Sequence, residues 1–161
     1  MASGKSAVGN ILANKLGMQF VDLDDFIEQN EQLSIAKIFE LKGEIYFRKK
    51  EAEYLLELVN FESNTIISLG GGTPCYGNNM EIIEQNTKSF YLNASIQTIF
   101  DRLKTETSQR PLVATIGKEN LKEYIAKHLF ERTVFYKRAQ HTIIVDEKTV
   151  FQITDEIKEL L

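Results

Sequence analysis

The chain opens with Met1-Ala2-Ser3-Gly4-Lys5-Ser6, which matches the second half of the phosphate-binding pattern G-x-x-x-x-G-K-[ST]. Small residues allow backbone N–H groups to turn toward phosphate oxygens, and the following helix adds its positive N-terminus. In this pattern Lys5 reaches the β- and γ-phosphates of a nucleotide, and the Ser6 hydroxyl is a ligand of Mg²⁺. The residues predicted to bind ATP are therefore Ala2, Ser3, Gly4, Lys5, Ser6 and Ala7.

So short a motif can also occur by chance, but its surroundings favour a true phosphate loop. A helical apolar pattern opens directly at Lys5, a predicted strand ends in Asp22 at βαβ spacing, and a second Gly-rich loop follows a later strand. The first Gly of the pattern would lie two residues before Met1, and a strand would precede it. We therefore expect the natural protein to begin upstream, with an apolar strand and a Gly.

The elements that position these residues alternate between short apolar runs and helical periods, which is typical of a parallel sheet with helices on both faces. Gly17 is a stop signal for the first helix, and Gly43 is expected to divide a long helical segment. Helices are predicted at about residues 4–16, 34–43, 44–59, 96–103, 120–138 and 150–161. Strands are predicted at about residues 18–22, 65–69, 89–92 and 142–145.

Length and composition indicate a single domain over residues 1–161, with 43% hydrophobic and 26% charged residues. The net charge of −4 argues against a nucleic-acid partner, because such proteins usually carry a basic excess. No run approaches the roughly 20 apolar residues of a membrane helix, and no signal-peptide core follows the first residues. The single Cys75 cannot form an internal disulfide, which suits a reducing, cytoplasmic location.

Several short motifs follow the phosphate loop in a fixed order. Each is weak alone, but together they are specific, and they span nearly the whole chain. They are Asp22-Leu23-Asp24, Ser34-Ile35-Ala36-Lys37-Ile38-Phe39, Phe47-Arg48-Lys49-Lys50-Glu51, Gly70-Gly71-Gly72, Arg110-Pro111-Leu112 and Arg132-Thr133-Val134-Phe135-Tyr136. In this order and at this spacing the chain resembles the shikimate kinases, small α/β enzymes of the P-loop NTPase type, similar to nucleoside monophosphate kinases, with three layers and a mobile lid.

On the acceptor side, the resemblance implies that Arg48 and Arg132 bind the carboxylate of shikimate, since planar guanidinium donors match its two oxygens. It places Asp24 beside the reacting hydroxyl, where the carboxylate could orient or deprotonate the nucleophile. Glycines allow the backbone to approach the substrate, and aromatic rings could form an apolar wall beside its ring. The remaining acceptor residues implied in this way are Gly70, Gly71, Gly72, Phe39 and Phe47.

On the nucleotide side, the resemblance implies that Asp22 and Ser6 hold Mg²⁺, partly through water. The polar stretch at about residues 105–117 corresponds to the family's lid, and Arg110 within it would neutralise charge on the transferred phosphoryl group. Many family members place an arginine on adenine after the last strand, where this chain has only Lys148. Arg102 is the better candidate for an adenine contact.

The resulting hypothesis is ATP-dependent phosphorylation of the 3-hydroxyl of shikimate to shikimate 3-phosphate, a step of aromatic amino-acid (chorismate) biosynthesis, by a monomer. One alternative is another small-molecule kinase of the same fold, such as one acting on gluconate or a nucleotide. A different class of alternative is a degenerate, non-catalytic binding module. Without the family match, Arg48 and Arg132 could be surface residues paired with Glu, and Asp22 and Asp24 could simply form a turn.

Overall fold

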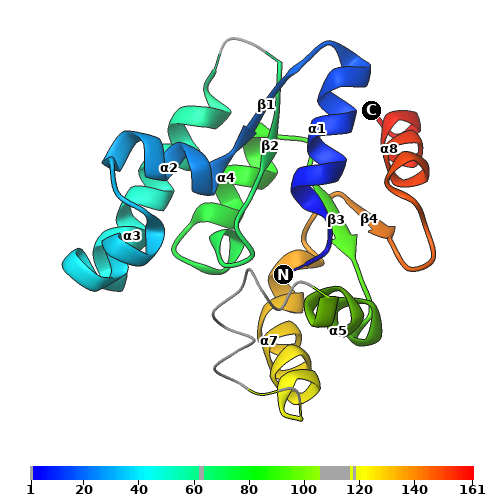
Figure 1. Cartoon of the computed structure of the whole chain (residues 1–161). Coiled ribbons are helices and arrows are strands. Elements are labelled where there is room, and N and C mark those ends of the chain that lie inside the picture. Colours follow the sequence, from blue (N-terminus) through cyan, green and yellow to red (C-terminus); the bar gives the residue numbers. More distant parts are fainter. Residues whose placement is uncertain (1, 62–63, 106–116, 118) are drawn as a thin grey trace.

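The computed structural model describes residues 2–61, 64–105, 117 and 119–161. Helices and strands follow one another along these residues. In Figure 1, α2 and α3 lie on one side of helix α1, and α8 and β4 lie on its other side. In chain order the elements are α1 Lys5–Leu16, β1 Gln19–Asp22, α2 Leu23–Glu31, α3 Ile35–Val59, β2 Thr65–Ser68, the short 3₁₀ helix η1 Thr73–Cys75, α4 Asn79–Asn86, β3 Phe90–Asn93, α5 Ile96–Thr105, α7 Leu121–Tyr136, β4 His141–Ile144 and α8 Val150–Glu159.

The helix boundaries follow the stop and start signals of the sequence. Gly17 ends α1 in the left-handed conformation with φ 65°, and its N–H donates to the carbonyl of Ala13. Ser34 caps α3, since its hydroxyl accepts a hydrogen bond from the Lys37 N–H. Gly43 interrupts α3 with φ 80° and ψ 171°, so the predicted division of this helical segment is confirmed.

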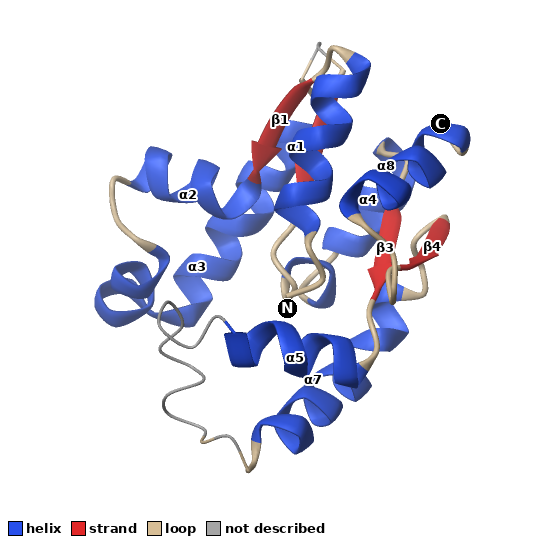
Figure 2. Cartoon of the chain, turned by 45° about the vertical axis from the view of Figure 1, so that its right-hand side comes forward, coloured by secondary structure: helices blue, strands red, loops and turns tan. Residues whose placement is uncertain are grey.

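The strands form two parallel pairs. In one pair β1 lies beside β2, with Phe20 opposite Ile66, and in the other β3 lies beside β4, with Leu92 opposite Ile143. No hydrogen-bonded ladder joins β2 to β3 within the described residues, and Figure 2 shows the pairs apart. The four predicted strands are therefore present and parallel, but they form two half-sheets where the sequence predicts one sheet.

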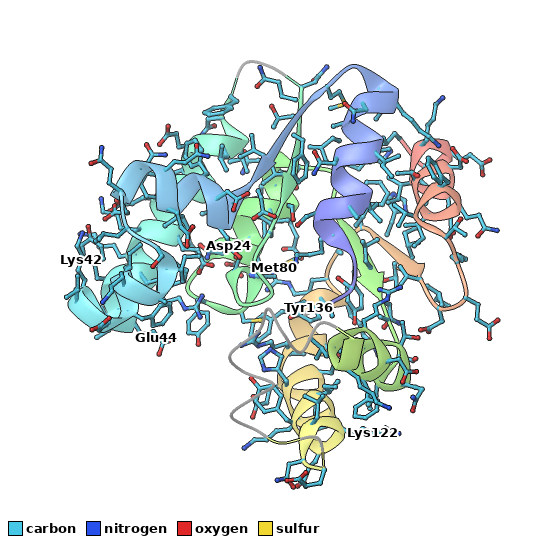
Figure 3. All side chains as sticks on the ribbon, viewed as in Figure 1. Asp24, Lys42, Glu44, Met80, Lys122 and Tyr136 are labelled. Atoms are coloured by element: carbon cyan, nitrogen blue, oxygen red, sulfur yellow. The ribbon has the colours of Figure 1, made fainter. Side chains whose placement is uncertain are left out.

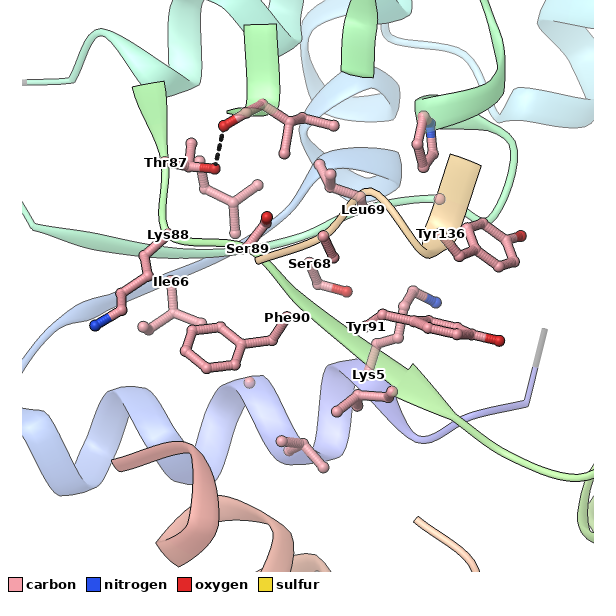
Figure 4. A pocket seen from close by; sticks show the side chains of 18 of the residues that line it. Lys5, Ile66, Ser68, Leu69, Thr87, Lys88, Ser89, Phe90, Tyr91 and Tyr136 are labelled. Atoms are coloured by element: carbon pink, nitrogen blue, oxygen red, sulfur yellow. Dashed lines mark hydrogen bonds between the residues drawn. The ribbon is translucent and has the colours of Figure 1, made fainter. Parts of the chain in front are cut away.

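A cavity of about 590 Å³ separates the half-sheets, and mostly apolar side chains surround it. Ile66 and Ser68 of β2 line it, as do Phe90 and Tyr91 of β3 and Lys5 at the start of α1 (Figure 4). The buried Ser68 hydroxyl has no hydrogen-bond partner in the described part of the chain. The continuous sheet that the sequence predicts is interrupted at this cavity.

The hydrophobic interior forms two clusters that follow the same division. The first joins α1, α5, α7 and α8 to the β3–β4 pair, and it includes Val8, Leu12 and Ile143. The second joins α2, α3 and α4 and includes Leu23 and Ile38. Helix α1 packs against α8 and also contacts β1 and β2, so it connects the two sides. No helix in the described ranges has the length and apolarity that crossing a membrane requires.

Candidate active site

The phosphate loop leads directly into helix α1. Gly4 is the N-cap residue and has φ 89°, a left-handed conformation that residues with a Cβ adopt at a cost. Behind it, the first turn of α1 offers backbone N–H groups that have no partner within the helix, together with the positive end of the helix dipole. The segment therefore has the backbone geometry of an anion-binding helix start, with Lys5 at its first position.

Asp22 joins the phosphate loop to the acceptor side. Its Oδ2 accepts a hydrogen bond of 2.9 Å from the Ser6 hydroxyl, and its Oδ1 accepts one of 3.1 Å from the Asp24 N–H. A hydroxyl and a carboxylate at hydrogen-bond distance are oxygen ligands of the kind that Mg²⁺ prefers. The described residues contain no cluster of three or more His, Cys, Asp or Glu able to hold a metal ion. Ser6 and Asp22 thus offer two oxygen groups beside the phosphate loop.

Asp24 lies in the first turn of α2, close to the Gly-rich loop (Figure 3). Burial raises the pKa of its carboxyl above the usual 3.8, and the negative charge of Asp22 raises it further, while Lys5 acts in the opposite direction. A Cβ built on Gly70 would stand only 3.0 Å from Asp24 Oδ1. The carboxylate therefore lies against the Gly-rich loop and within the electrostatic influence of the phosphate-loop lysine.

Arg48 extends from α3 toward the same loop, and buried polar groups hold it. Its Nη1 donates to Glu51 Oε2 at 2.8 Å, and Glu51 is only 1% exposed. Glu51 Oε1 accepts a hydrogen bond of 2.7 Å from the Thr73 hydroxyl, and the Thr73 carbonyl accepts one of 2.9 Å from the Asn79 side chain. The guanidinium therefore sits at the end of a chain of buried hydrogen bonds that begins in α4.

The Gly-rich loop, residues 70–72, lies between these groups and α7. A Cβ on Gly72 would stand 3.0 Å from Arg48 Nη1, so the lack of a side chain at residue 72 lets the guanidinium lie this close to the loop. On the other side, the Tyr136 hydroxyl donates a hydrogen bond of 2.6 Å to the Gly71 carbonyl. The loop is therefore fixed between α3 and the C-terminal end of α7.

Arg132 lies one helical turn before Tyr136, on the same face of α7. Burial raises the pKa of the Cys75 thiol, while the charges of Arg132 and Arg48 both lower it. Arg132 also helps burial to lower the pKa of His128 to about 4. Both arginines predicted to bind a carboxylate are thus close enough to act on one side chain at the edge of the Gly-rich loop.

Phe39 and Phe47, the predicted apolar wall, lie together on the two sides of the Gly43 break. Their ring centroids are 4.7 Å apart; Phe47 is buried, whereas Phe39 is 37% exposed. The Arg48 guanidinium carbon lies 5.0 Å from the Phe47 ring centroid. The pair therefore borders the arginine, and Phe39 offers its outer surface.

A sequence model of the shikimate kinase family matches residues 1–161. The shikimate kinase of Flavobacterium johnsoniae is 46% identical over 162 residues, covering 100% of this chain and 94% of that protein. A crystal structure of the Bacteroides thetaiotaomicron shikimate kinase superimposes with a TM-score of 0.93 at 33% identity, covering 99% of this chain and 93% of that one. The Acinetobacter baumannii shikimate kinase, solved in complex with shikimate, gives 0.86 at 30% identity, with coverage of 99% and 87%.

The chain belongs to the shikimate kinase family. The predicted α/β fold of the P-loop NTPase type is thereby confirmed, as is the resemblance that the ordered motifs indicated. The predicted enzyme class, a kinase acting on shikimate, agrees with the similarity to the Flavobacterium johnsoniae protein and to the Acinetobacter baumannii structure.

Arg102, the predicted adenine contact, and Lys148, which replaces the family's arginine, both have partners within the described residues. Arg102 Nη1 donates to the Ala2 carbonyl at 3.0 Å, so this guanidinium lies against the phosphate loop, on the side where a nucleotide is expected. Lys148 pairs with Glu156 of α8. Arg110 and nearly all of the predicted lid at residues 105–117 lie outside the described residues.

Sequence reasoning did not assign roles to several residues that shape this shikimate kinase site. Tyr136 stands four residues after Arg132, a spacing that places both on one helix face and could have indicated a shared role. Thr73 and Asn79 form the buried hydrogen bonds behind Glu51, and Tyr76 covers Arg48. No local pattern marks these three, because Thr73 and Tyr76 have their partners in α3, far away in the sequence, and Asn79 acts through Thr73.

Proposed function

We propose that this chain carries out the shikimate kinase reaction with the following division of roles. Arg48 and Arg132 bind the shikimate carboxylate, and residues 70–72 hold the acceptor against the protein backbone. Phe39 and Phe47 border the sugar-like ring. The supporting observations are that Arg48 lies beside Gly72 and that Tyr136, one helical turn after Arg132, donates a hydrogen bond to the Gly71 carbonyl. Asp24 lies against the same loop, where burial raises its pKa and the charge of Lys5 partly offsets this rise.

Asp24 would orient the acceptor 3-hydroxyl and take up its proton as the phosphoryl group is transferred. A raised pKa suits this task, because a carboxyl titrating closer to neutral pH is a better proton acceptor once ionised. Phosphoryl transfer depends mostly on positioning and charge stabilisation, so a strong base is not required. The adjacent Lys5 would stabilise charge on the transferred phosphate, and Arg110 would do the same from the predicted lid.

ATP would bind at the start of α1 through residues 2–7, with Arg102 beside the loop. Ser6 and Asp22, which already share a hydrogen bond, would hold Mg²⁺. Bound Mg²⁺ would neutralise charge on the nucleotide phosphates. The enzyme would act as a monomer in the cytoplasm, with no nucleic-acid or membrane partner.

An assay that couples ADP release to a spectroscopic signal tests this function. Shikimate should stimulate ADP release in the presence of ATP and Mg²⁺, whereas gluconate should not. Absence of shikimate-stimulated turnover would contradict the proposal. Light scattering of the same sample would give the molar mass in solution and so test whether the enzyme is a monomer.

The role of Arg132 is tested by Arg132→Ala. Losing hydrogen bonds between charged groups, worth about 1.5–3 kcal/mol, should raise the KM for shikimate about 10-fold or more. The KM for ATP should change much less, because Arg132 lies on the acceptor side of the loop. Equal increases in both constants would show that Arg132 does not bind the carboxylate.

A further inference from the structure

The side chains of Glu51, Glu44 and Tyr76 contact the Arg48 guanidinium. Glu51 accepts a hydrogen bond from Nη1, and Glu44 accepts a longer one of 3.4 Å from Nε. The ring of Tyr76 lies against the guanidinium, with its centroid only 3.8 Å from Cζ. That distance is well inside the roughly 6 Å within which a cation and an aromatic ring attract one another. No hydrogen bond within the described residues uses Arg48 Nη2, so this donor group is available to a ligand.

The Tyr76 ring is itself fixed. Its hydroxyl donates a hydrogen bond of 3.0 Å to Glu44 Oε1, the same oxygen that Arg48 Nε reaches (Figure 3 labels Glu44). Its backbone carbonyl accepts a hydrogen bond of 3.2 Å from the Asn79 N–H, which ties the residue to the start of α4. Tyr76 directly follows the short helix η1, and η1 begins after Gly72. The ring and the Gly-rich loop therefore belong to one continuous segment.

These contacts divide the surroundings of Arg48 into an inner and an outer part. The inner partner, Glu51, is 1% exposed, whereas Tyr76 is 37% exposed and the Glu44 side chain is 54% exposed. Tyr76 and Glu44 therefore border the guanidinium on its solvent side. Without the ring, a guanidinium held mainly at one edge could turn about its bond to Glu51.

We propose that Tyr76 is a positioning residue that holds the Arg48 guanidinium plane for the acceptor carboxylate, and that Glu44 fixes the tyrosine ring. Bidentate binding of a carboxylate requires the guanidinium to lie in the plane of the two oxygens. With its centroid 3.8 Å from Cζ, the Tyr76 ring restricts the rotation of that plane. This role of Tyr76 rests on the carboxylate-binding function proposed for Arg48.

Steady-state kinetics of the full chain test the role of the ring. Tyr76→Leu removes the ring and should raise the KM for shikimate about fivefold, while the KM for ATP and kcat stay within about twofold. Tyr76→Phe keeps the ring and loses only the hydroxyl, so its effect should be about twofold. Melting temperatures of all variants would show that they are folded.

Phe151→Leu is the matched control. Phe151 is 61% exposed on α8, and Lys15 lies over its ring at 5.6 Å, so this variant removes an exposed cation–π contact far from Arg48. It should leave both KM values unchanged. An unchanged KM for shikimate in Tyr76→Leu, or an equal rise in the KM for ATP, would overturn the proposal.

A double-mutant cycle distinguishes positioning from general support of the fold. In an Arg48→Lys background there is no planar group to orient, so Tyr76→Leu should raise the KM for shikimate much less than it does in the natural sequence. Glu44→Gln combined with Tyr76→Phe should have no more effect than either change alone. Full additivity in both cycles would overturn the proposal. Loss of shikimate turnover in the unmodified chain would instead contradict the proposed function.

Discussion

Arg48 and Lys5 represent two ways of placing a cation for an anionic ligand. The Arg48 guanidinium contacts Glu51, Glu44 and Tyr76, and a buried chain of hydrogen bonds supports it from behind. Lys5, at the start of α1, makes no hydrogen bond or ion pair with the residues that the structure describes. One cation is fixed by the fold, and the other is positioned mainly by its backbone.

The difference matches the chemistry of the two ligands. A carboxylate gains its full interaction only from a guanidinium with the correct orientation, so fixing the side chain beforehand improves binding. An ammonium group is a compact point charge on a flexible stem, and it needs only to reach the phosphates. We therefore expect changes on the acceptor side to affect both folding and shikimate binding, and changes at Lys5 to affect turnover alone.

Lys5→Ala should have the largest effect on turnover. Removing a charge that stabilises the transferred phosphate should lower kcat about 100- to 1000-fold, by analogy with the loss of one transition-state donor. The melting temperature should hardly change, because Lys5 has no hydrogen-bond or ion-pair partner within the described residues. Kinetics and thermal melting check both parts. A large fall in melting temperature would break the distinction between the two cations.

Asp24→Asn should lower kcat about 100-fold or more, since a positioned proton acceptor contributes at least that much. It should also stabilise the protein at neutral pH. The folded pKa of Asp24 is raised, so the native state loses stability as the pH rises from the usual value near 3.8 through that raised pKa. The uncharged Asn removes this loss.

Melting temperatures measured across the pH range check this prediction. The difference between Asp24→Asn and the natural sequence should be largest at neutral pH and should vanish at a pH below the usual pKa of Asp. An equal difference at all pH values would show that the charge of Asp24 is not responsible.

Glu51→Gln should affect binding and stability together. Arg48 would lose its buried charged partner, so the KM for shikimate should rise about 10-fold and the free energy of unfolding should fall by about 1–3 kcal/mol. Glu53→Gln is the matched control on the same helix, because Glu53 pairs with Lys50 at the surface. That change should cost less than about 1 kcal/mol. Equal effects of the two variants, measured by denaturant unfolding, would contradict the role given to Glu51.

Gly72→Ala should have the smallest effect, which comes from crowding. The φ of Gly72 is −87°, a value open to alanine, but the new Cβ would stand 3.0 Å from Arg48 Nη1. Displacing the guanidinium should raise the KM for shikimate a few-fold, roughly the cost of slight overpacking. Gly17→Ala is the opposite case, with an unfavourable backbone angle and no crowding. The φ of Gly17 is 65°, and an added Cβ would have no atom within 4 Å. This change should therefore cost about 1 kcal/mol of stability and leave the KM values for shikimate and ATP unchanged.

The sequence predicted those parts of the fold that depend on local patterns. The end of α1 at Gly17 and the break at Gly43 agree with the structure, because a glycine with positive φ is a local signal.

Helices α2 and α4 were not predicted. Helix α2 follows β1 without a loop, and its cap, Asp22, was interpreted as a metal ligand or turn residue. Helix α4 has only eight residues, too few for a clear periodicity.

The site was predictable where an ordered series of motifs named its residues, and not where contacts alone define them. Asp24, Arg48 and residues 70–72 stand in such motifs, and the structure brings them together. Tyr76 lies 28 positions after Arg48, and only the path of the chain through β2 and η1 places its ring on the guanidinium. Contacts of this range depend on the whole fold.

The cavity between β2 and β3 has a consequence for how ligands stabilise the protein. The two hydrophobic clusters lie on opposite sides of it, and no strand ladder links them within the described residues. Helix α1 contacts β1 and β2 as well as α8, and α7 contacts η1, so the opening of one cluster is coupled to the other through these contacts. A ligand stabilises the folded elements that bind it. Shikimate bound by Arg48 of α3 and Arg132 of α7 would contact elements of both clusters and should protect amides on both sides from hydrogen exchange, whereas ATP at the start of α1 should protect mainly the amides of α1 and of the elements packed on it.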